Sequence, residues 1–486
     1  FNYASVGAMA LYEKNPEVMY VGLGEPQLRQ SVSWGDGMYK SVDGGETWEH
    51  IGLKDSLHIA RVRIHPDNPD LVYVASMGHA FGPSEERGVF RTRDGGQTWE
   101  KVLYQNESTG AIDLVMSPGD PDVLFAALWT FERKAWGSFF GGPDGGIWRT
   151  RDGGDTWEEI TARPSLPEGD TARIGLTMSA ADPNRVYALI DSETQTGLYR
   201  SDDLGDTWKF VSDDANITAR PFYFTHIYAN PSNADELWSP ANKLWRSPDA
   251  GQTWILEPSA KDDFQDIWID PKDSNRMIVT CDGGTVVTLT GGKTWSSFAN
   301  QSGVQFYRVD TDDEFPYRVY GNAQDLLVYS IPSASIWGGI PLHMTNYIGN
   351  GETGSAIPKP GDPNIVYSLS TGATFGGATM FTVNNLETGQ TQPRPIWPEV
   401  QFGTPASEFK YRFNWQAPFL VSPHDPNTIY FAGNVVFRSR DEGMTWETIS
   451  DDLTHNMTDK MKVAGSEWLP EYFGQETFST IHRLAE

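Results

Sequence analysis

The chain has 486 residues and a formal net charge of −28, from 37 Lys and Arg against 65 Asp and Glu. Such an acidic surface repels phosphate backbones, which argues against a nucleic-acid partner. No apolar run approaches the ~20 residues of a membrane-spanning helix, so membrane insertion is not expected. Glycine is abundant (48 residues), and the single cysteine, Cys281, cannot form an intrachain disulfide. The composition predicts many short strands joined by turns.

One motif recurs along the chain, Ser/Thr-x-Asp-x-Gly-x-Thr-Trp. A degenerate copy that ends at Trp295 has Thr290 in place of the aspartate. The spacing between successive tryptophans up to Trp295 is 41 to 58 residues, and the longer interval before Trp446 fits three units, two of which have lost the motif. A repeat of this length is typical of a protein built from stacked supersecondary units. The complete copies end at Trp48, Trp99, Trp157, Trp208, Trp254 and Trp446.

A second pattern precedes the motif: a strand, a turn rich in Pro and Asp, and another strand. Examples are Ile59–Ala75, Ala111–Ala127 and Phe419–Gly433. Together with the hairpin that carries the motif, this pattern predicts four strands per unit, A to D. We count nine such units, with Phe478–Ala485 as strand A of a tenth. Four-stranded units of this length are typical of a β-propeller, in which each blade stacks on its neighbours.

The predicted fold is therefore all-β and propeller-based. Residues 1–300 hold six blades with the motif, and residues 301–486 hold three more divergent blades plus the first strand of a tenth. The motif has a structural interpretation: its aspartate accepts hydrogen bonds from turn amides, its glycine permits positive φ, and its tryptophan packs between blades. The B–C loops and D–A connections share the opposite side of the propeller, where we expect ligands.

Four further segments, with the motif, carry a resemblance to a known family: YVGLGE (Tyr20–Glu25), CDGG (Cys281–Gly284), YGNAQD (Tyr320–Asp325) and FNWQAPFLVSPHDP (Phe413–Pro426). They resemble bacterial Asp-box (BNR-type) propellers that are related to the sortilin N-terminal domain and often labelled glycosyl-hydrolase-like. More distantly, the chain is similar to tandem-propeller xyloglucanases. The resemblance covers essentially the whole chain.

The resemblance implies fold more firmly than activity. It also implies a longer protein, with another blade before Phe1 and several after Glu486, in a two-propeller architecture or, alternatively, a ten-bladed ring like that of sortilin. The sequence departs from the family pattern at two places. Leu326 and Leu327 follow NAQD, where relatives carry polar residues, and Asp262–Asp270 lacks the family's histidines.

Carboxylates on the expected ligand side are candidates for glycosidase chemistry, which needs two of them across a cleft. We select Asp282, Asp325 and Glu25 as candidate catalytic residues. The alternative for Asp282 and Asp325 is a turn-forming role, since Asp282 lies beside two glycines. The carboxylates on this side are Glu25, Asp191, Asp266, Asp282 and Asp325.

Arginines and aromatic residues on the same side are candidates for ligand binding, because aromatic rings stack on sugars and arginines hold carboxylates. The alternative is that they pack loops onto the blades. The nine histidines never take a metal-ligand spacing, so no metal site is predicted. No cofactor is expected, although acidic pairs such as Asp262–Asp263 can hold calcium. The candidate ligand-binding residues are Arg133, Trp136, Arg220, Tyr223, Gln324, Arg412 and Trp415.

Two functional hypotheses follow. The first is a secreted, periplasmic or cell-surface binding module that recognises a polysaccharide or a protein through its B–C loop face. The alternative is a carbohydrate-active enzyme, a glycoside hydrolase or polysaccharide lyase, with carboxylates at the mouth of the central channel. The sequence favours the binding module, because no catalytic constellation stands out. The remaining blades of a longer precursor are a further expected partner.

Overall fold

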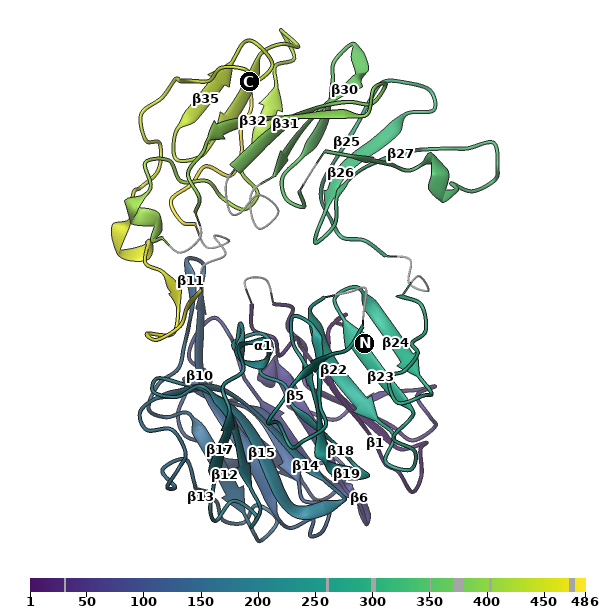
Figure 1. Cartoon of the computed structure of the whole chain (residues 1–486), viewed down its shortest axis with the longest axis vertical. Helices are drawn as coiled ribbons and strands as arrows, with labels where there is room; N and C mark the ends of the chain where they lie inside the picture. Colours follow the sequence, from purple (N-terminus) through teal and green to yellow (C-terminus); the bar gives the residue numbers. More distant parts are fainter. Residues whose placement is uncertain are drawn as a thin grey trace. The chain divides into compact units, whose positions relative to one another are not determined.

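The computed structural model describes residues 1–29, 32–258, 262–298, 303–349, 351–370, 379–401, 404–471 and 477–486. The chain divides into two compact units (Figure 1). The first comprises Phe1–Lys134, Ser138–Gln301 and Ser466–Leu469, and the second comprises Ala135–Gly137, Ser302–Gly465 and Pro470–Glu486. Strands dominate both units, which confirms the all-β prediction.

The first unit contains six antiparallel sheets, drawn in purple to teal in Figure 1. The first three are β1 (Val6–Leu11), β2 (Met19–Leu23), β3 (Met38–Ser41) and β4 (Glu49–His50); β5 (Ile59–His65), β6 (Asn68–Ser76), β7 (Gly88–Thr92) and β8 (Glu100–Leu103); and β9 (Thr109–Met116), β10 (Leu124–Lys134), β12 (Gly146–Thr150) and β13 (Glu158–Glu159), with β11 (Gly137–Phe140) beside β10. The next three are β14 (Thr171–Ser179), β15 (Asp182–Ser192), β16 (Gly197–Ser201) and β17 (Lys209–Ser212); β18 (Tyr228–Asn230), β19 (Asn233–Pro240), β20 (Leu244–Ser247) and β21 (Ile255–Leu256); and β22 (Phe264–Ile269), β23 (Met277–Cys281) and β24 (Gly284–Thr288).

The second unit contains three antiparallel four-stranded sheets. They are β25 (Phe306–Thr311), β26 (Arg318–Ala323), β27 (Val328–Pro332) and β28 (Asn346–Ile348); β29 (Ala356–Lys359), β30 (Asp362–Ser370), β31 (Thr379–Asn385) and β32 (Gln390–Trp397); and β33 (Phe419–Val421), β34 (Ile429–Ala432), β35 (Val436–Ser439) and β36 (Glu447–Thr448). A short hairpin pairs β37 (Ala464–Gly465) with β38 (Pro470–Glu471).

Helical segments are short. They are α1 (Ala215–Thr218), η1 (Lys54–Ser56), η3 (Leu342–Met344), η5 (Ala406–Glu408) and η6 (Thr458–Lys460). In the part of the chain that the structure describes, no helix is long and apolar enough to cross a membrane.

Successive sheets of the first unit meet through their first strands, as the blades of a propeller do: β1 contacts β5, β5 contacts β9, β9 contacts β14, and β14 contacts β18. In the third blade, Leu124 of β10 lies opposite Met116 of β9 and Thr150 of β12. The stretch Leu124–Trp129 is buried throughout, because neighbouring blades cover both faces of β10. The prediction of a propeller built from four-stranded blades is confirmed.

The turn between the third and fourth strands of a blade is closed by the repeat motif. In the second copy, the Asp94 carboxylate accepts the backbone N–H of Thr98 (2.9 Å) and its hydroxyl (2.6 Å). The Thr92 hydroxyl accepts the N–H of Gly96 at 2.9 Å and donates to Asp94 at 2.8 Å. The hydrogen bonds from Thr98 and Thr92 lower the pKa of Asp94 to about 2. The carboxylate serves the turn, as the structural interpretation predicts.

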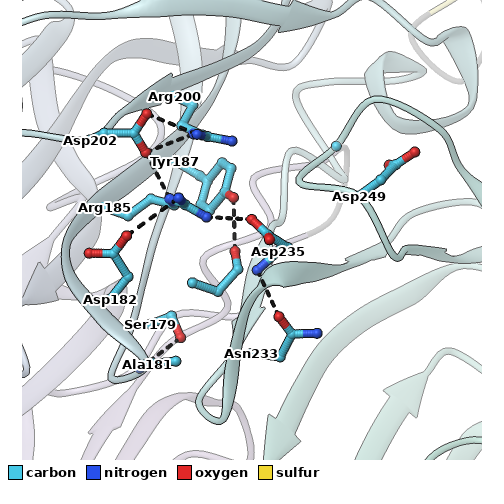
Figure 2. Close-up of polar contacts among 12 residues, drawn as sticks. Ser179, Ala181, Asp182, Arg185, Tyr187, Arg200, Asp202, Asn233, Asp235 and Asp249 are labelled. Carbon is cyan, nitrogen blue, oxygen red and sulfur yellow. Dashed lines mark hydrogen bonds and ion pairs between the residues drawn. The ribbon is translucent and has the colours of Figure 1, made fainter.

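Ion pairs join neighbouring blades beside these turns. Figure 2 shows the Arg185 guanidinium among three carboxylates: Asp182 at 3.4 Å, Asp202 at 2.8 Å and Asp235 at 2.5 Å. Arg185 and Asp182 belong to β15, whereas Asp235 belongs to β19 of the next blade. Burial alone would raise the pKa of Asp202, but hydrogen bonds from Arg200, Lys209 and Arg185 hold it far below its usual value. Part of the large acidic surplus is thus engaged in holding blades together.

Two details of the predicted repeat are wrong. Residues 478–485 form no strand; Ile481 donates one backbone hydrogen bond to Gly433 (2.8 Å), and one bond does not make a ladder. Within the described residues, the sixth blade has three strands rather than four, since residues 289–298 form no strand. Its motif is the degenerate copy, in which the Thr290 hydroxyl accepts the N–H of Thr294 (2.9 Å) in place of a carboxylate.

Candidate functional site

Three connections of the first unit bring together four of the residues selected from sequence. Glu25 follows β2, Arg220 and Tyr223 lie between β17 and β18, and Asp282 lies between β23 and β24. Gly24 turns the chain into the first loop at φ +96°, and a Cβ there would lie 1.8 Å from the Leu57 carbonyl oxygen. These loops all lie on the side where the sequence predicts ligands. The first unit therefore presents a cluster of acids, arginines and a tyrosine there.

Glu25 is partly buried and hydrogen-bonded. Its carboxylate accepts the Arg29 Nε–H at 3.2 Å and the backbone N–H of Ser33 at 3.3 Å. The side chain keeps 21% of its exposure. Burial raises the pKa of Glu25, and the Arg29 charge offsets only part of that shift. A carboxyl group with a raised pKa that still reaches solvent is suited to donate a proton.

Tyr223 connects this acid to the second one. Its hydroxyl contacts both carboxylate oxygens of Asp282, at 3.2 and 3.3 Å. Its ring lies 5.7 Å from the Arg29 guanidinium carbon and 5.1 Å from that of Arg220, distances at which cations are attracted to aromatic rings. Burial raises the pKa of Tyr223, so the hydroxyl stays protonated and donates to the carboxylate. The side chains of Glu25, Arg29, Tyr223 and Asp282, with Arg220, are called here the loop-side cluster.

Asp282 is exposed, and its loop is fixed by the neighbouring strand. The Asp282 N–H donates to the Asp263 carbonyl at 3.1 Å, and Gln265 Nε2 approaches the carboxylate at 3.4 Å. Arg220 lies 3.9 Å from the Asp263 carboxylate. The exposed Asp282 carboxylate thus lies at one end of a chain of contacts through Tyr223 and Arg29, and the shielded Glu25 carboxyl group lies at the other end. Paired carboxyl groups in unlike surroundings are the arrangement from which acid and base roles arise.

Two other selected residues have packing contacts. Arg133 is 5% exposed and donates to the Ser138 hydroxyl at 2.8 Å across the hairpin of β10 and β11. Trp136 lies against Phe478 (5.9 Å between ring centroids) and under the Lys460 ammonium (4.7 Å). For both, the contacts described are with neighbouring side chains of the protein.

The second unit holds the remaining selected residues in two places. Asp325 sits in a turn at φ +56°, its N–H donates to the Glu352 carboxylate at 2.9 Å, and its own carboxylate accepts Gln324 Nε2 at 3.2 Å. Arg412 is 5% exposed and pairs with Asp452 at 2.6 Å, while Trp415 donates its indole N–H to the Tyr307 hydroxyl at 3.1 Å. The conformation of Asp325 fits the turn-forming alternative.

Sequence reasoning missed two members of the site's surroundings. Arg29 holds the Glu25 carboxylate, and the signal for it was the spacing of four residues between an acid and a base. Gln265 reaches Asp282 from β22, and no pattern in the sequence indicates that contact.

Within the described residues, no group of three His, Cys, Asp or Glu side chains could hold a metal ion. The acidic pair named as able to hold calcium faces cations: Asp262 pairs with Lys243, and Asp263 faces Arg220.

Asp191 is the most shielded carboxylate on this side. It is 1% exposed at the end of β15, and its Oδ1 accepts the Trp468 indole N–H at 2.9 Å and the Thr196 hydroxyl at 3.2 Å. Its Oδ2 is buried and has no hydrogen-bond partner among the described residues. Burial raises the pKa of Asp191 to about 6. The ionised form is therefore unfavourable in the folded chain.

We predict that Asp191→Asn removes a pH dependence of stability. Because the folded pKa of about 6 exceeds the unfolded value of 3.8, the folded state holds the extra proton between them and loses stability as the pH rises. The wild type should therefore lose about 2 kcal/mol of unfolding free energy, relative to Asp191→Asn, between pH 4 and pH 7. Urea unfolding at each pH, followed by tryptophan fluorescence, measures this difference. A constant difference, or one found equally with the exposed Asp213→Asn, would contradict the prediction.

Comparisons with known proteins find sequence similarity to proteins of more than one kind. The Acetivibrio thermocellus xyloglucanase Xgh74A is 25% identical over 291 residues, which are 52% of this chain and 32% of that protein. Vacuolar protein sorting/targeting protein 10 of Sordaria macrospora is 32% identical over 83 residues, 17% of this chain and 5% of its own length. No family model matches the chain. The predicted resemblance to xyloglucanases is confirmed as a sequence similarity.

A solved structure of the same kind aligns with most of the chain. The Niastella koreensis GH74 enzyme covers 92% of this chain and 78% of its own, at 14% identity and a TM-score of 0.44. This chain spans about a third of the length of the first curated relatives.

Proposed function

We propose that the protein is a glycoside hydrolase that cleaves a β-glucan polysaccharide of the xyloglucan type. The observation that carries the proposal is the loop-side cluster, in which Tyr223 links the shielded Glu25 region to the exposed Asp282. The xyloglucanase relatives support the choice of substrate. This proposal replaces the binding module, which the sequence favoured, with its enzymatic alternative.

In this mechanism Glu25 is the general acid that protonates the leaving oxygen. Its raised pKa keeps the proton available at a pH where an ordinary glutamate has lost it. Asp282 is the second carboxylate, and a hydrogen bond from the Tyr223 hydroxyl orients it. Two exposed aromatic residues on loops of the same side, Trp34 (48% exposed) and Phe81 (38%), offer flat faces for sugar rings.

The substrate class sets the location of the enzyme. A polysaccharide of this size does not enter cells, so the proposed hydrolase acts outside the cytoplasm, as a secreted, periplasmic or cell-surface protein. The acidic surface is compatible with an uncharged glucan, because a neutral polymer is neither attracted nor repelled by net charge.

Incubation of the full chain with soluble xyloglucan tests the proposal. We expect new reducing ends and a falling polymer mass, with much less product from an unsubstituted mannan at equal concentration. Affinity electrophoresis in gels containing the same polymers separates binding from cleavage. Retention on xyloglucan without cleavage would contradict the hydrolase and support the binding module. No retention and no cleavage would overturn the proposal as a whole.

A further inference from the structure

The centre of the first unit contains a cavity of about 170 Å³. It lies among the innermost strands β5, β9, β14 and β18, and its polar lining includes Arg61, Arg63, Asp113 and Tyr228. Val115, Met116 and Met178 also line it, and these residues stand near the ends of β9 and β14 that lead into the turns between first and second strands. The loop-side cluster lies on the loops that follow β2, precede β18 and join β23 to β24, on the other side of the blades. The cavity is therefore a separate feature.

Two arginines enter the cavity from a single strand. Arg61 and Arg63 are two positions apart on β5, so both side chains leave the same face of the strand. Arg61 is fully engaged: its Nε donates to Asp113 at 2.9 Å and its Nη2 to the Tyr228 hydroxyl at 3.2 Å. The other Asp113 interactions are with backbone N–H groups, those of Leu114 and Leu176, both at 2.9 Å. The one carboxylate lining the cavity is thus paired with Arg61.

Arg63 has no comparable partner. Its one side-chain hydrogen bond to a described residue goes to the Val62 carbonyl, at 3.0 Å. Burial and the neighbouring Arg61 charge lower the pKa of Arg63, a direction that shows an unfavourable setting for its positive charge. Arg63 is partly buried, and a partly buried charge loses hydration without the gain of a direct ion pair. Because the chain has a net charge of −28, its overall composition does not explain an excess of positive charge in this cavity.

A third cation lies close to the first two. Arg173 donates to the carbonyls of Phe222 (2.7 Å) and Tyr223 (3.2 Å), and its other Nη contacts His226 Nε2 at 3.2 Å. Carbonyls satisfy its N–H groups but do not neutralise its charge. Burial and the Arg61 charge lower the pKa of Arg173 to about 9. Across from these arginines, Tyr228 also interacts with the Asp266 carboxylate.

We propose that this cavity binds a small oxyanion, with Arg63 as its principal ligand and Arg61 as a second source of positive charge. A guanidinium presents paired N–H donors that match two oxygens of a phosphate, sulfate or carboxylate group. The cavity volume admits such a polyatomic anion, and the anion would give Arg63 the direct ion pair that no described carboxylate makes with it. The proposal does not depend on the hydrolase activity, because the residues and the end of the channel are different.

Titration calorimetry of the full chain with inorganic phosphate, sulfate, acetate and malonate tests the site, each against chloride at constant ionic strength. We expect saturable binding of at least one oxyanion, and the ranking of phosphate and sulfate against acetate and malonate distinguishes a tetrahedral anion from a carboxylate. Arg63→Gln should weaken that binding at least 10-fold, whereas Arg63→Lys should retain part of it. The matched control is Arg93→Gln, which removes the same charge from an arginine whose side chain is 60% exposed.

The thermal unfolding midpoint gives a second readout that does not depend on heats of binding. The wild-type midpoint should rise with the bound oxyanion, and Arg63→Gln should be insensitive to it while remaining folded by circular dichroism. If Arg63→Gln is unfolded, two other measurements test the site. Arg63→Lys should bind the oxyanion more weakly than the wild type, and a crystal soaked in selenate should show an anomalous signal beside Arg63. No saturable binding of any of the four anions, or equal losses in Arg63→Gln and Arg93→Gln, would overturn the proposal.

Discussion

Glu25→Gln should lower kcat for xyloglucan hydrolysis by about 10²–10⁴-fold, the contribution typical of a general acid. Glutamine preserves the shape of the side chain and keeps one oxygen, which can accept from either Arg29 or the Ser33 N–H, so the loop should stay folded. The substitution removes the transferable proton and one of the two acceptor oxygens. Initial rates of reducing-end release over a range of substrate concentrations separate kcat from KM. An unchanged kcat would show that Glu25 is not the acid.

The pH profile gives an independent check on the same residue. Because burial raises the pKa of Glu25, the acid should stay protonated to a higher pH than an ordinary glutamate, and kcat should fall as the pH rises through that value. The alkaline limb should disappear in Glu25→Gln. Asp282→Asn should lower kcat by a similar factor, since the second carboxylate is also required. Glu46→Gln, an exposed glutamate in the first repeat-motif turn, should match the wild type.

Arg87→Ala should destabilise the first unit by about 4 kcal/mol. The substitution leaves four backbone carbonyls without their hydrogen-bond donor, at a cost of about 1 kcal/mol or more each. Arg87 is 1% exposed, and its guanidinium donates to the carbonyls of Ser108 (2.7 Å), Phe131 (3.0 Å), His79 (2.9 Å) and Gly82 (3.3 Å). The residue therefore ties the loop after β6 to the third blade. The midpoint of guanidinium-induced unfolding should fall accordingly.

Arg93→Ala is the matched control for this substitution. Arg93 lies on an exposed turn and pairs with Asp155 at 2.7 Å, both side chains being more than half exposed. Exposed ion pairs contribute ~0–1 kcal/mol, so the control should unfold close to the wild type. Arg87→Lys, which keeps a charge but has only three donors in a compact group, should fall between the two. Equal midpoints for Arg87→Ala and Arg93→Ala would contradict the role given to Arg87.

The repeat made most of the fold predictable. Each motif is a local signal, in which Ser or Thr, Asp, Gly and Trp close one turn, so strands and blade order could be read directly from spacing. The errors arose where the signal was incomplete. In the sixth motif Thr290 replaces the aspartate, so the carboxylate is lost while the rest of the pattern remains recognisable. The described residues of that blade form no fourth strand. Residues 478–485 have a strand-like pattern, but a strand also needs a partner to pair with.

The loop-side cluster was only partly predictable. Position on one side of the blades was enough to select Glu25, Tyr223 and Asp282 from three separate loops. It was not enough to pair them, because the link through Tyr223 depends on side-chain directions that no local pattern specifies. The same filter also selected Arg133 and Arg412, whose charges are used for packing. The cavity arginines were missed because Arg61 and Arg63 lie within a strand rather than in a loop.

The degenerate sixth turn has an evolutionary consequence. In the intact copies one carboxylate offers two acceptor atoms, and every bond it makes stays within its own turn. At Thr290 a hydroxyl accepts the equivalent N–H bond, and the first three strands of that blade persist. The motif carboxylate can therefore be replaced without loss of a contact between blades, because its own hydrogen bonds reach no other blade. Such independence lets a chain of repeats diversify one blade at a time and leaves the loops on the opposite side free to acquire new residues under selection.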